Sequence, residues 1–582
     1  MTSSEDRTRY VGTLVGESTS REFRLAVAHE AIREQDIIAV DAELRSPDGA
    51  SPPESIRVWA KVQRIERLNP LFPAEAGQEL AATRTNPFDT VLSLSREMVT
   101  AVCQVLGAET RDAKSGGRLD HLRYPPQPAS SAYGPSAADI ARVVLGELGQ
   151  QQRRALDIAT LSNRPDVTVK VDGHAIVTRH LAVLAMTGAG KSWTVRRIIE
   201  ELANKNYPIV IFDPHGDYTG LADVPELRQR VTRYYANLPI FEEDSETVAK
   251  IVDTLGYPLT DTMRTRFGDV FDAAATFYGA DPTERQERGE WLANHLKRPD
   301  IARFGIGPNM WLLANIAEAG ELTLRGNELK DNSQHRLLEW GWPALSTYSK
   351  TDVRTLEAIK KRVYTAAAAL RRMEETNRRV ASDAKPLPID RTQVVQYGHI
   401  SVVSLAGYTS DFQATLYSII ASEIFGARVS DRLSLPVLLV LEEAHNFAPA
   451  RAETPAEQRA TAITRQIAQE GRKFGVGLII ISQRPSRLDE TTLSQCNSQI
   501  IMRLVNPADQ SFVRRVIESL GEDEAKMLPD LDVGEALLAG QLTSFPVLVR
   551  IKPPLSQGER EEQDAFEALE QAHKRLSSDG RA

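Results

Sequence analysis

The first part of the chain alternates apolar and polar residues in short runs separated by turn-forming residues. Between about Tyr10 and Arg67 these runs are RYVGTLVG, EFRLAVA, DIIAVDAEL and, after the turn-rich SPDGASPPES, SIRVWAKVQRI. Alternation is typical of strands with one buried face, and several short strands at this spacing are typical of a small barrel or sandwich. The pattern predicts a small N-terminal β-barrel in residues 1–123.

A segment rich in proline, alanine and serine follows, YPPQPASSAYGPS from Tyr124 to Ser136. Proline has no backbone N–H to donate, so this composition disfavours both helix and strand. We interpret residues 124–154 as a linker with a connecting helix.

The pattern then changes to apolar runs that alternate with amphipathic helices. Alternating strands and helices indicate an α/β fold with a parallel sheet, and continuously apolar strands indicate burial on both faces. We expect an α/β core in residues 155–220 and 396–552. Its strands are predicted to begin at Leu181, Pro208, His399, Pro436, Val476 and Ser498.

The strand signal disappears between the two halves of this core. Residues 221–395 instead contain helical segments such as RTLEAIKKRVYTAAAALRRMEETNRRV from Arg354, which predicts an α-helical insertion. Residues 553–582 end the chain in a charged helix, REEQDAFEALEQAHKRLSS from Arg560. This helix either braces a neighbouring subunit or is a solvated tail.

The strongest chemical motif is AMTGAGKSWT, Ala185 to Thr194, between an apolar strand and a predicted helix. Glycines let such a loop direct its backbone N–H groups at phosphate oxygens, and the helix N-terminus adds a favourable dipole. Lys191 is expected to reach the β- and γ-phosphates and Ser192 to hold Mg²⁺. This P-loop motif predicts that the core formed by residues 155–220 and 396–552 is a P-loop ATPase. The predicted ATP-binding residues are Thr187, Gly188, Ala189, Gly190, Lys191, Ser192 and Trp193.

One position departs from the usual G-x-x-x-x-G-K-[ST] pattern, because Ala185 stands where glycine is expected. Alanine carries only a Cβ, so the loop can still form if φ at Ala185 is negative.

An acidic pair follows another apolar strand, in LPVLLVLEEAHNFAP. Ligands of α/β folds collect at the carboxyl ends of parallel strands, where Glu442 and Glu443 are expected. Glu442 is the candidate for the Mg²⁺ shell, and Glu443 for the general base that polarises the attacking water. The alternative is a solvated pair that starts a helix.

Two further polar groups end predicted strands. Gln483, in GLIIISQRPSRLD, is a candidate sensor that touches the γ-phosphate or orients the water. In IVIFDPHGDY, Asp213, His215 and Asp217 surround a sharp turn. They either assist the metal site or form an Asx-type turn that closes the strand.

Composition narrows the class of protein. With 42% hydrophobic and 26% charged residues the chain is expected to be globular, and the N-terminus lacks the apolar core of a signal peptide. Cys103 and Cys496 are far apart, which favours neither zinc nor a disulfide framework and suggests the cytoplasm. We expect no membrane span. A net charge of −9 disfavours a protein that coats nucleic acid but allows a ring with a positive pore.

Together, the spans LDIATLSNRPDVTVKVDGHAIVTRHLAVLAMTGAGKSWT, IVIFDPHGDY, VLEEAHNFAP and EGRKFGVGLIIISQRPS resemble HerA-type ATPases of the HerA/FtsK superfamily. The resemblance covers the core, reaches the barrel in pattern only and leaves the helical insertion largely unassigned. It implies a homo-hexameric ring, an N-terminal HAS barrel, a RecA-like motor and a nuclease partner, often NurA, that acts on DNA ends.

The resemblance also implies that an arginine from the adjacent subunit completes each site. Arg472 is the first candidate and Arg179 the second, and either can instead be an ordinary interface arginine. For DNA the candidates are Arg484 and Arg487, and a basic cluster that a solvated helix face also explains: Lys360, Lys361 and Arg362.

The leading hypothesis is therefore an ATP-driven translocase or helicase on double-stranded DNA, with ATP and Mg²⁺ as cofactors. It would feed an effector (NurA-like, sirtuin-like or another defence nuclease) in DNA-end processing or anti-phage defence. One alternative is an ATP-regulated ring scaffold that assembles and controls an effector enzyme. Another is a motor of the conjugation or secretion type.

Overall fold

The computed structural model divides the chain into two compact units. One comprises Met1–Glu201 and Cys496–Pro554, and the other Leu202–Gln495 and Leu555–Ala582. The structure describes residues 9–28, 31–44, 54–68, 98–110, 117–146, 152–235, 240–301, 309–326, 333–381, 383–518, 520–556 and 565–578.

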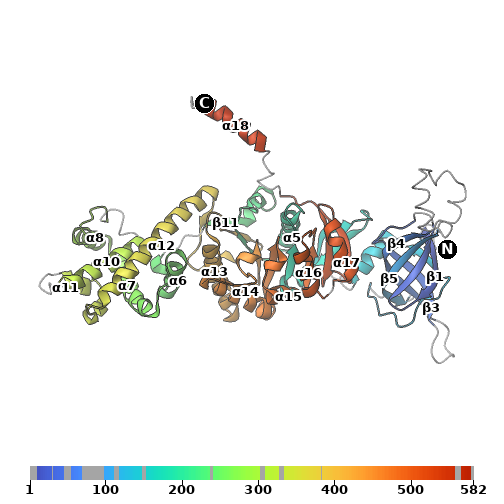
Figure 1. Cartoon of the computed structure of the whole chain (residues 1–582), viewed down its shortest axis with the longest axis horizontal. Helices are drawn as coiled ribbons and strands as arrows, with labels where there is room; N and C mark the ends of the chain where they lie inside the picture. Colours follow the sequence, from blue (N-terminus) through green and yellow to red (C-terminus); the bar gives the residue numbers. More distant parts are fainter. Residues whose placement is uncertain are drawn as a thin grey trace, which may run out of the picture. The chain divides into compact units, whose positions relative to one another are not determined.

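The first unit begins with a closed antiparallel barrel, drawn in blue in Figure 1. Buried apolar side chains such as Phe23, Leu25 and Val58 fill its interior. The fold class and the barrel are confirmed, and the four predicted runs correspond to β1–β4. The order around the barrel is β1 (Arg9–Ser18), β2 (Glu22–Val27), β5 (Met98–Thr110), β4 (Glu54–Leu68), β3 (Ile37–Leu44) and β6 (Ser131–Gly134).

Strand β6 corrects the interpretation of Tyr124 to Ser136 as a segment without regular structure. Its residues pair with both β1 and β3, so this short strand closes the barrel. Prolines flank β6 but do not interrupt it, and Ala132 is completely buried. Closure satisfies two strand edges that would otherwise remain unpaired, which outweighs the weak propensity of the sequence.

The same unit contains the sheet that carries the P-loop. Strand β9 (Leu181–Leu184) pairs in parallel with β16 (Ser498–Ile501), and the next pairs are antiparallel. Helix α5 (Lys191–Asn204) follows β9, and α4 (Gly173–Arg179) precedes it. The remaining strands, in sheet order, are β17 (Glu535–Gly540), β18 (Val547–Ile551), β7 (Ala155–Leu161) and β8 (Thr168–Asp172).

The second unit contains a parallel sheet whose central strands are buried along their whole length. Helices α13 (Ser410–Val429) and α14 (Pro455–Phe474) connect its strands. The order is β12 (Lys385–Pro386), β11 (Val231–Tyr235), β13 (Ile400–Ser404), β10 (Ile209–Asp213), β14 (Val437–Leu441) and β15 (Val476–Ser482). Strand β11 corrects the expectation that 221–395 contains no strand. It is only five residues long and its sequence, VTRYY, has no apolar run.

The helices between β11 and β12 gather together (Figure 1). The longest, α12 (Asp352–Val380), is tied to the sheet because the buried Asn377 amide donates to the carbonyls of Ser404 and Ala406. The others are α6 (Ser245–Leu255), α7 (Asp261–Gly279), α8 (Pro282–His295), α10 (Met310–Arg325) and α11 (Ser333–Glu339). A separate helix, α18 (Ala565–Ser578), lies near the end of the chain.

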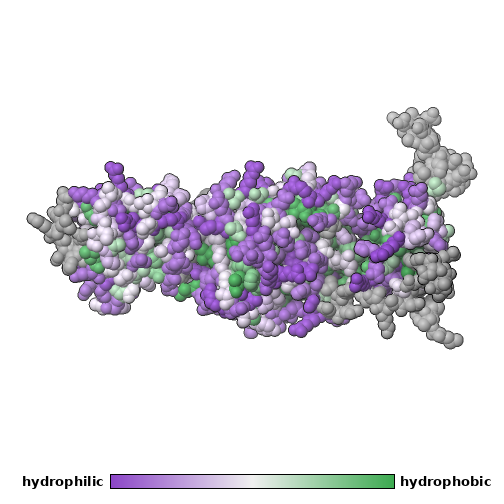
Figure 2. Space-filling view, turned by 90° about the horizontal axis from the view of Figure 1, so that it is seen from below, coloured by the Kyte–Doolittle hydropathy of each residue, from purple (hydrophilic) through white to green (hydrophobic). Residues whose placement is uncertain are grey.

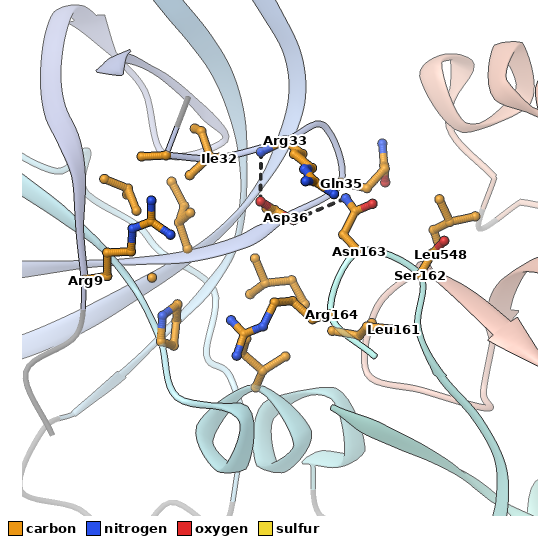
Figure 3. Close-up of a pocket in the computed structure, with 17 residues that line it drawn as sticks. Arg9, Ile32, Arg33, Gln35, Asp36, Leu161, Ser162, Asn163, Arg164 and Leu548 are labelled. Atoms are coloured by element: carbon orange, nitrogen blue, oxygen red, sulfur yellow. Dashed lines mark hydrogen bonds between the residues drawn. The ribbon is translucent and has the colours of Figure 1, made fainter. Parts of the chain in front are cut away.

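Polar contacts join the barrel to the rest of the first unit. Lys61 on β4 and Glu524 on α17 (Glu522–Met527) form an ion pair at 2.6 Å, with side chains only 2% and 7% exposed. A cavity of about 500 Å³ lies beside the barrel, and Arg9 and Arg164 are among the residues that line it (Figure 3). At its edge, the side-chain amide of Asn163 donates a hydrogen bond to Asp36.

Apolar residues on the surface are scattered among hydrophilic ones on the face in Figure 2. Within the described ranges, no helix is both long and apolar enough to cross a bilayer. The side chains of Cys103 and Cys496 are buried, and burial raises the pKa of both thiols.

The buried ion pair makes a prediction about stability. Lys61→Ala should destabilise the barrel by about 3–5 kcal/mol, because it leaves the carboxylate of Glu524 buried without its cation. Hydrogen exchange of the β4 amides measures the local loss. The double variant Lys61→Met with Glu524→Leu should recover most of it.

The matched control is the exposed pair Arg371–Glu375, whose side chains are 70% and 57% exposed. Arg371→Ala should cost less than about 1 kcal/mol in the exchange of α12. Equal effects of the two single variants would contradict the importance of the Lys61 contact.

Candidate active site

The glycine turn of the P-loop begins directly after the buried strand β9. Gly188 has φ +79° and Gly190 φ +100°, a left-handed region that glycine enters without a Cβ clash. The N–H of Met186 donates to the carbonyl of Arg503, and the carbonyl of Ala189 accepts from Gly534. The turn is thus anchored at both sides and leads into the N-terminus of α5, an arrangement suited to binding phosphate.

The predicted nucleotide-binding residues differ in exposure. Lys191 is 7% exposed and Ala189 2%, Ser192 is half-buried, and Thr187 and Gly188 are exposed. Trp193 is 56% exposed on the first turn of α5.

Ala185, which replaces the usual glycine, is completely buried at the end of β9. It is not among the described residues with positive φ. The conformation there is therefore open to any L-residue, which explains why alanine is tolerated.

The acidic pair follows β14 in the second unit. Glu442 is completely buried and Glu443 is 4% exposed, which is rare for carboxylates unless they have partners. Glu443 adopts φ 49° and ψ 54°, the left-handed conformation that costs a non-glycine residue about 1–2 kcal/mol. Such strain concentrates at functional sites. Burial excludes the alternative of a solvated pair that starts a helix.

Gln483 lies beside the second glutamate, because β14 and β15 are adjacent parallel strands. Its side-chain amide donates a hydrogen bond to Oε1 of Glu443. Nδ1 of His445, which sequence reasoning missed, lies 3.3 Å from Oε2 of the same carboxylate. Gln483 and His445 thus both contact the predicted general base.

Asp213 closes a turn. Its buried carboxylate accepts from the backbone N–H groups of Gly216 and Asp217 at 2.8 and 3.1 Å and from that of Tyr218 at 3.2 Å. Burial, and then the nearby charge of Asp217, raise the pKa of Asp213 to about 6. His215 is exposed. These contacts favour the interpretation of this cluster as a turn that closes the strand.

The residue that this turn delivers was missing from the sequence prediction. The hydroxyl of Tyr218 donates to Oε2 of Glu442 at 2.5 Å, and both side chains are completely buried. A lone tyrosine after a turn carries no sequence signal for this role.

The candidate arginines occupy different surroundings. Arg179 ends α4, where its half-buried side chain donates to Gln541 of the same unit. Arg472 is exposed on the last turn of α14. Arg484 and Arg487 are exposed in the segment after β15.

Two of the three cations in the basic cluster on α12 form ion pairs with glutamates of α10 and α12. Lys360 pairs with Glu321 at 2.6 Å, and Lys361 pairs with Glu357 at 2.9 Å. Arg362 donates to the carbonyl of Pro258. The structure therefore favours a solvated or paired face over a DNA contact here.

Residues 156–424 match the family model of the central domain of helicase HerA. The DNA double-strand break repair helicase HerA of Pyrococcus furiosus is 31% identical over 491 residues, which cover 78% of each chain. This chain belongs to the HerA family. It is accordingly an ATPase.

The match to the HerA central domain includes the whole helical insertion, residues 221–395, which the motifs alone had left largely unassigned. The HerA of Saccharolobus solfataricus is 28% identical over 394 residues, 66% of each chain.

Solved structures resemble the chain more distantly. VirB4 of Thermoanaerobacter pseudethanolicus has a TM-score of 0.42 at 14% identity, covering 68% of this chain and 96% of VirB4. Plasmid coupling protein TrwB in complex with ADP and Mg²⁺ has a TM-score of 0.39 at 12% identity, covering 67% and 89%.

The glycine turn supplies a test of nucleotide binding. Gly190→Ala should weaken binding of a fluorescent ATP analogue by about tenfold or more, because a side chain at positive φ costs roughly 1–2 kcal/mol. The added Cβ would also lie 3.3 Å from Cε of Met502.

Ala185→Gly is the matched control. Because φ at Ala185 is not positive, this variant should lose only about 0.5–1 kcal/mol of stability and keep its affinity for the analogue. Wild-type affinity in Gly190→Ala would show that the turn does not bind the nucleotide.

Proposed function

We propose that this chain is an ATP-driven translocase or helicase that moves double-stranded DNA as a homo-hexamer and delivers it to a nuclease. The observation that carries the proposal is the buried acidic pair, with Gln483 donating to Glu443 at the end of adjacent strands. Membership of the HerA family supports DNA as the track. The name of the Pyrococcus furiosus relative supports a role at double-strand breaks.

The proposed chemistry divides among this chain's own residues. The backbone of the glycine turn and Lys191 bind the phosphates, and Glu443 accepts a proton from the attacking water while Gln483 orients it. Because burial hides Glu443 from bulk water, the proton has few competing acceptors. The proposal requires both sets of residues to act on one nucleotide.

Magnesium fits the donors present. Ser192 and Glu442 offer oxygen ligands, which Mg²⁺ prefers. In the described part of the chain, no group of three or more His, Cys, Asp or Glu could hold a metal. A bound Mg²⁺ would neutralise negative charge on the phosphates.

The motor proposal predicts that duplex DNA stimulates ATP hydrolysis by the intact chain. Glu443→Gln should lower the rate by about 10²–10⁴-fold, since it removes the base while keeping the shape of the side chain. Affinity for the ATP analogue should be retained in Glu443→Gln and lost in Lys191→Ala.

The same measurements distinguish the motor from the alternative of an ATP-regulated ring scaffold. A hydrolysis rate indifferent to DNA, with or without the nuclease partner, would count against a motor. A partner whose activity survives Glu443→Gln but not loss of the barrel would favour a ring that controls an effector.

A trans contribution of Arg472 makes its own prediction. Arg472→Ala alone should lose about 10³-fold or more in hydrolysis rate, as for other arginines that complete a neighbour's site. Mixing Arg472→Ala with Glu443→Gln subunits should then restore up to about a quarter of the wild-type rate, because some interfaces regain both groups. Absence of recovery after proven subunit exchange would contradict a trans role, and the same mixture with Arg179→Ala tests the second candidate.

A further inference from the structure

We propose that Tyr218 is a positioning residue that holds the side chain of Glu442 in the orientation needed to receive the magnesium ion of bound nucleotide. The inference rests on the proposed function, because it assumes that Glu442 takes part in the metal site. It adds a residue from the turn after β10 to the site that the paired glutamates define.

The contact itself is short and isolated from solvent. The phenolic hydroxyl donates to Oε2 of Glu442 at 2.5 Å, and neither side chain has measurable exposure. A buried tyrosine hydroxyl needs a partner, and a carboxylate acceptor makes the hydrogen bond stronger than a neutral one would.

The direction of the contact follows from its geometry. The phenolic O–H of Tyr218 donates and the carboxylate oxygen of Glu442 accepts.

Strand register explains how Tyr218 reaches a residue far away in sequence. Strands β10 and β14 are parallel neighbours in which Phe212 pairs with Leu441. Asp213, the last residue of β10, and Glu442, the first residue after β14, consequently lie side by side at this edge of the sheet. The carboxylate of Asp213 then accepts hydrogen bonds from the backbone of the turn, which places Tyr218 against Glu442 at the end of β14.

Positioning matters because a glutamate side chain has three rotatable bonds. A fixed carboxylate does not have to be ordered when the metal arrives, and one tied through Oε2 offers a defined geometry. Partners of this kind, which orient a metal ligand, typically change metal affinity by about 10–100-fold when removed.

The test uses the intact chain with ADP and Mn²⁺ in place of Mg²⁺, and measures bound Mn²⁺ by electron paramagnetic resonance. Tyr218→Phe should weaken Mn²⁺ binding to the protein–ADP complex by about 10–100-fold. Binding of a fluorescent ADP analogue without metal should be unchanged, because the phenol is completely buried and its hydroxyl is bonded to Glu442.

Tyr417→Phe is the matched control. Its hydroxyl is also buried, but it contacts Thr464 at 2.9 Å rather than a carboxylate. This variant loses one buried hydrogen bond of similar structural weight and should keep wild-type affinity for Mn²⁺.

A second variant guards against a folding defect in Tyr218→Phe. Asp213→Asn keeps the hydroxyl but weakens the turn that delivers it, and should also reduce Mn²⁺ affinity. Wild-type affinity in both Tyr218→Phe and Asp213→Asn, with a loss in Glu442→Gln, would overturn the positioning role and leave the proposed ATPase site standing. If neither Glu442→Gln nor Lys191→Ala affected ADP or Mn²⁺ binding, the proposed function itself would fail.

Discussion

The burial of two consecutive carboxylates is the constraint on which the structure of the second unit depends. Glu442 and Glu443 follow a strand that is buried along its whole length, and they remain buried themselves. Charged groups removed from water are tolerated only when hydrogen bonds replace hydration. Tyr218 and Gln483, which follow the neighbouring strands β10 and β15, supply hydrogen bonds to the pair. The burial of the pair therefore depends on this order of strands.

Parallel neighbours on both sides of β14 provide the partners that the two buried carboxylates need. Strand β14 lies between β10 and β15, and all three end at the same edge of the sheet. The turn after β10 contributes Tyr218, and the residue directly after β15 is Gln483. In an antiparallel neighbour, the residues at this edge would precede the strand instead of following it. Crossover helices such as α13 and α14 are the consequence of keeping the strands parallel.

Local patterns predicted the buried central strands and the P-loop, but neither the short strands β6 and β11 nor the contacts between elements. The apolar runs before Ala185 and Glu442 identified buried strands, and the glycine turn identified the P-loop, because each is encoded within a few residues. Tyr218 and Glu442 are separated by 224 positions, and their contact depends on strand register. Sequence periodicity contains no information on which strands become neighbours. Strand β6 was missed for the same reason, since its place depends on two distant edges that need a partner.

The conformation of Glu443 explains how two adjacent residues come to have different partners. A left-handed residue turns the chain sharply, so the side chains of Glu442 and Glu443 no longer follow the simple alternation of a strand. One carboxylate meets the hydroxyl from the β10 side, and the other meets the amide from the β15 side. The two carboxylates are thus held by separate groups, which is compatible with the separate roles proposed for them. The strain at Glu443 is therefore the structural cost of dividing the proposed roles between neighbours in sequence.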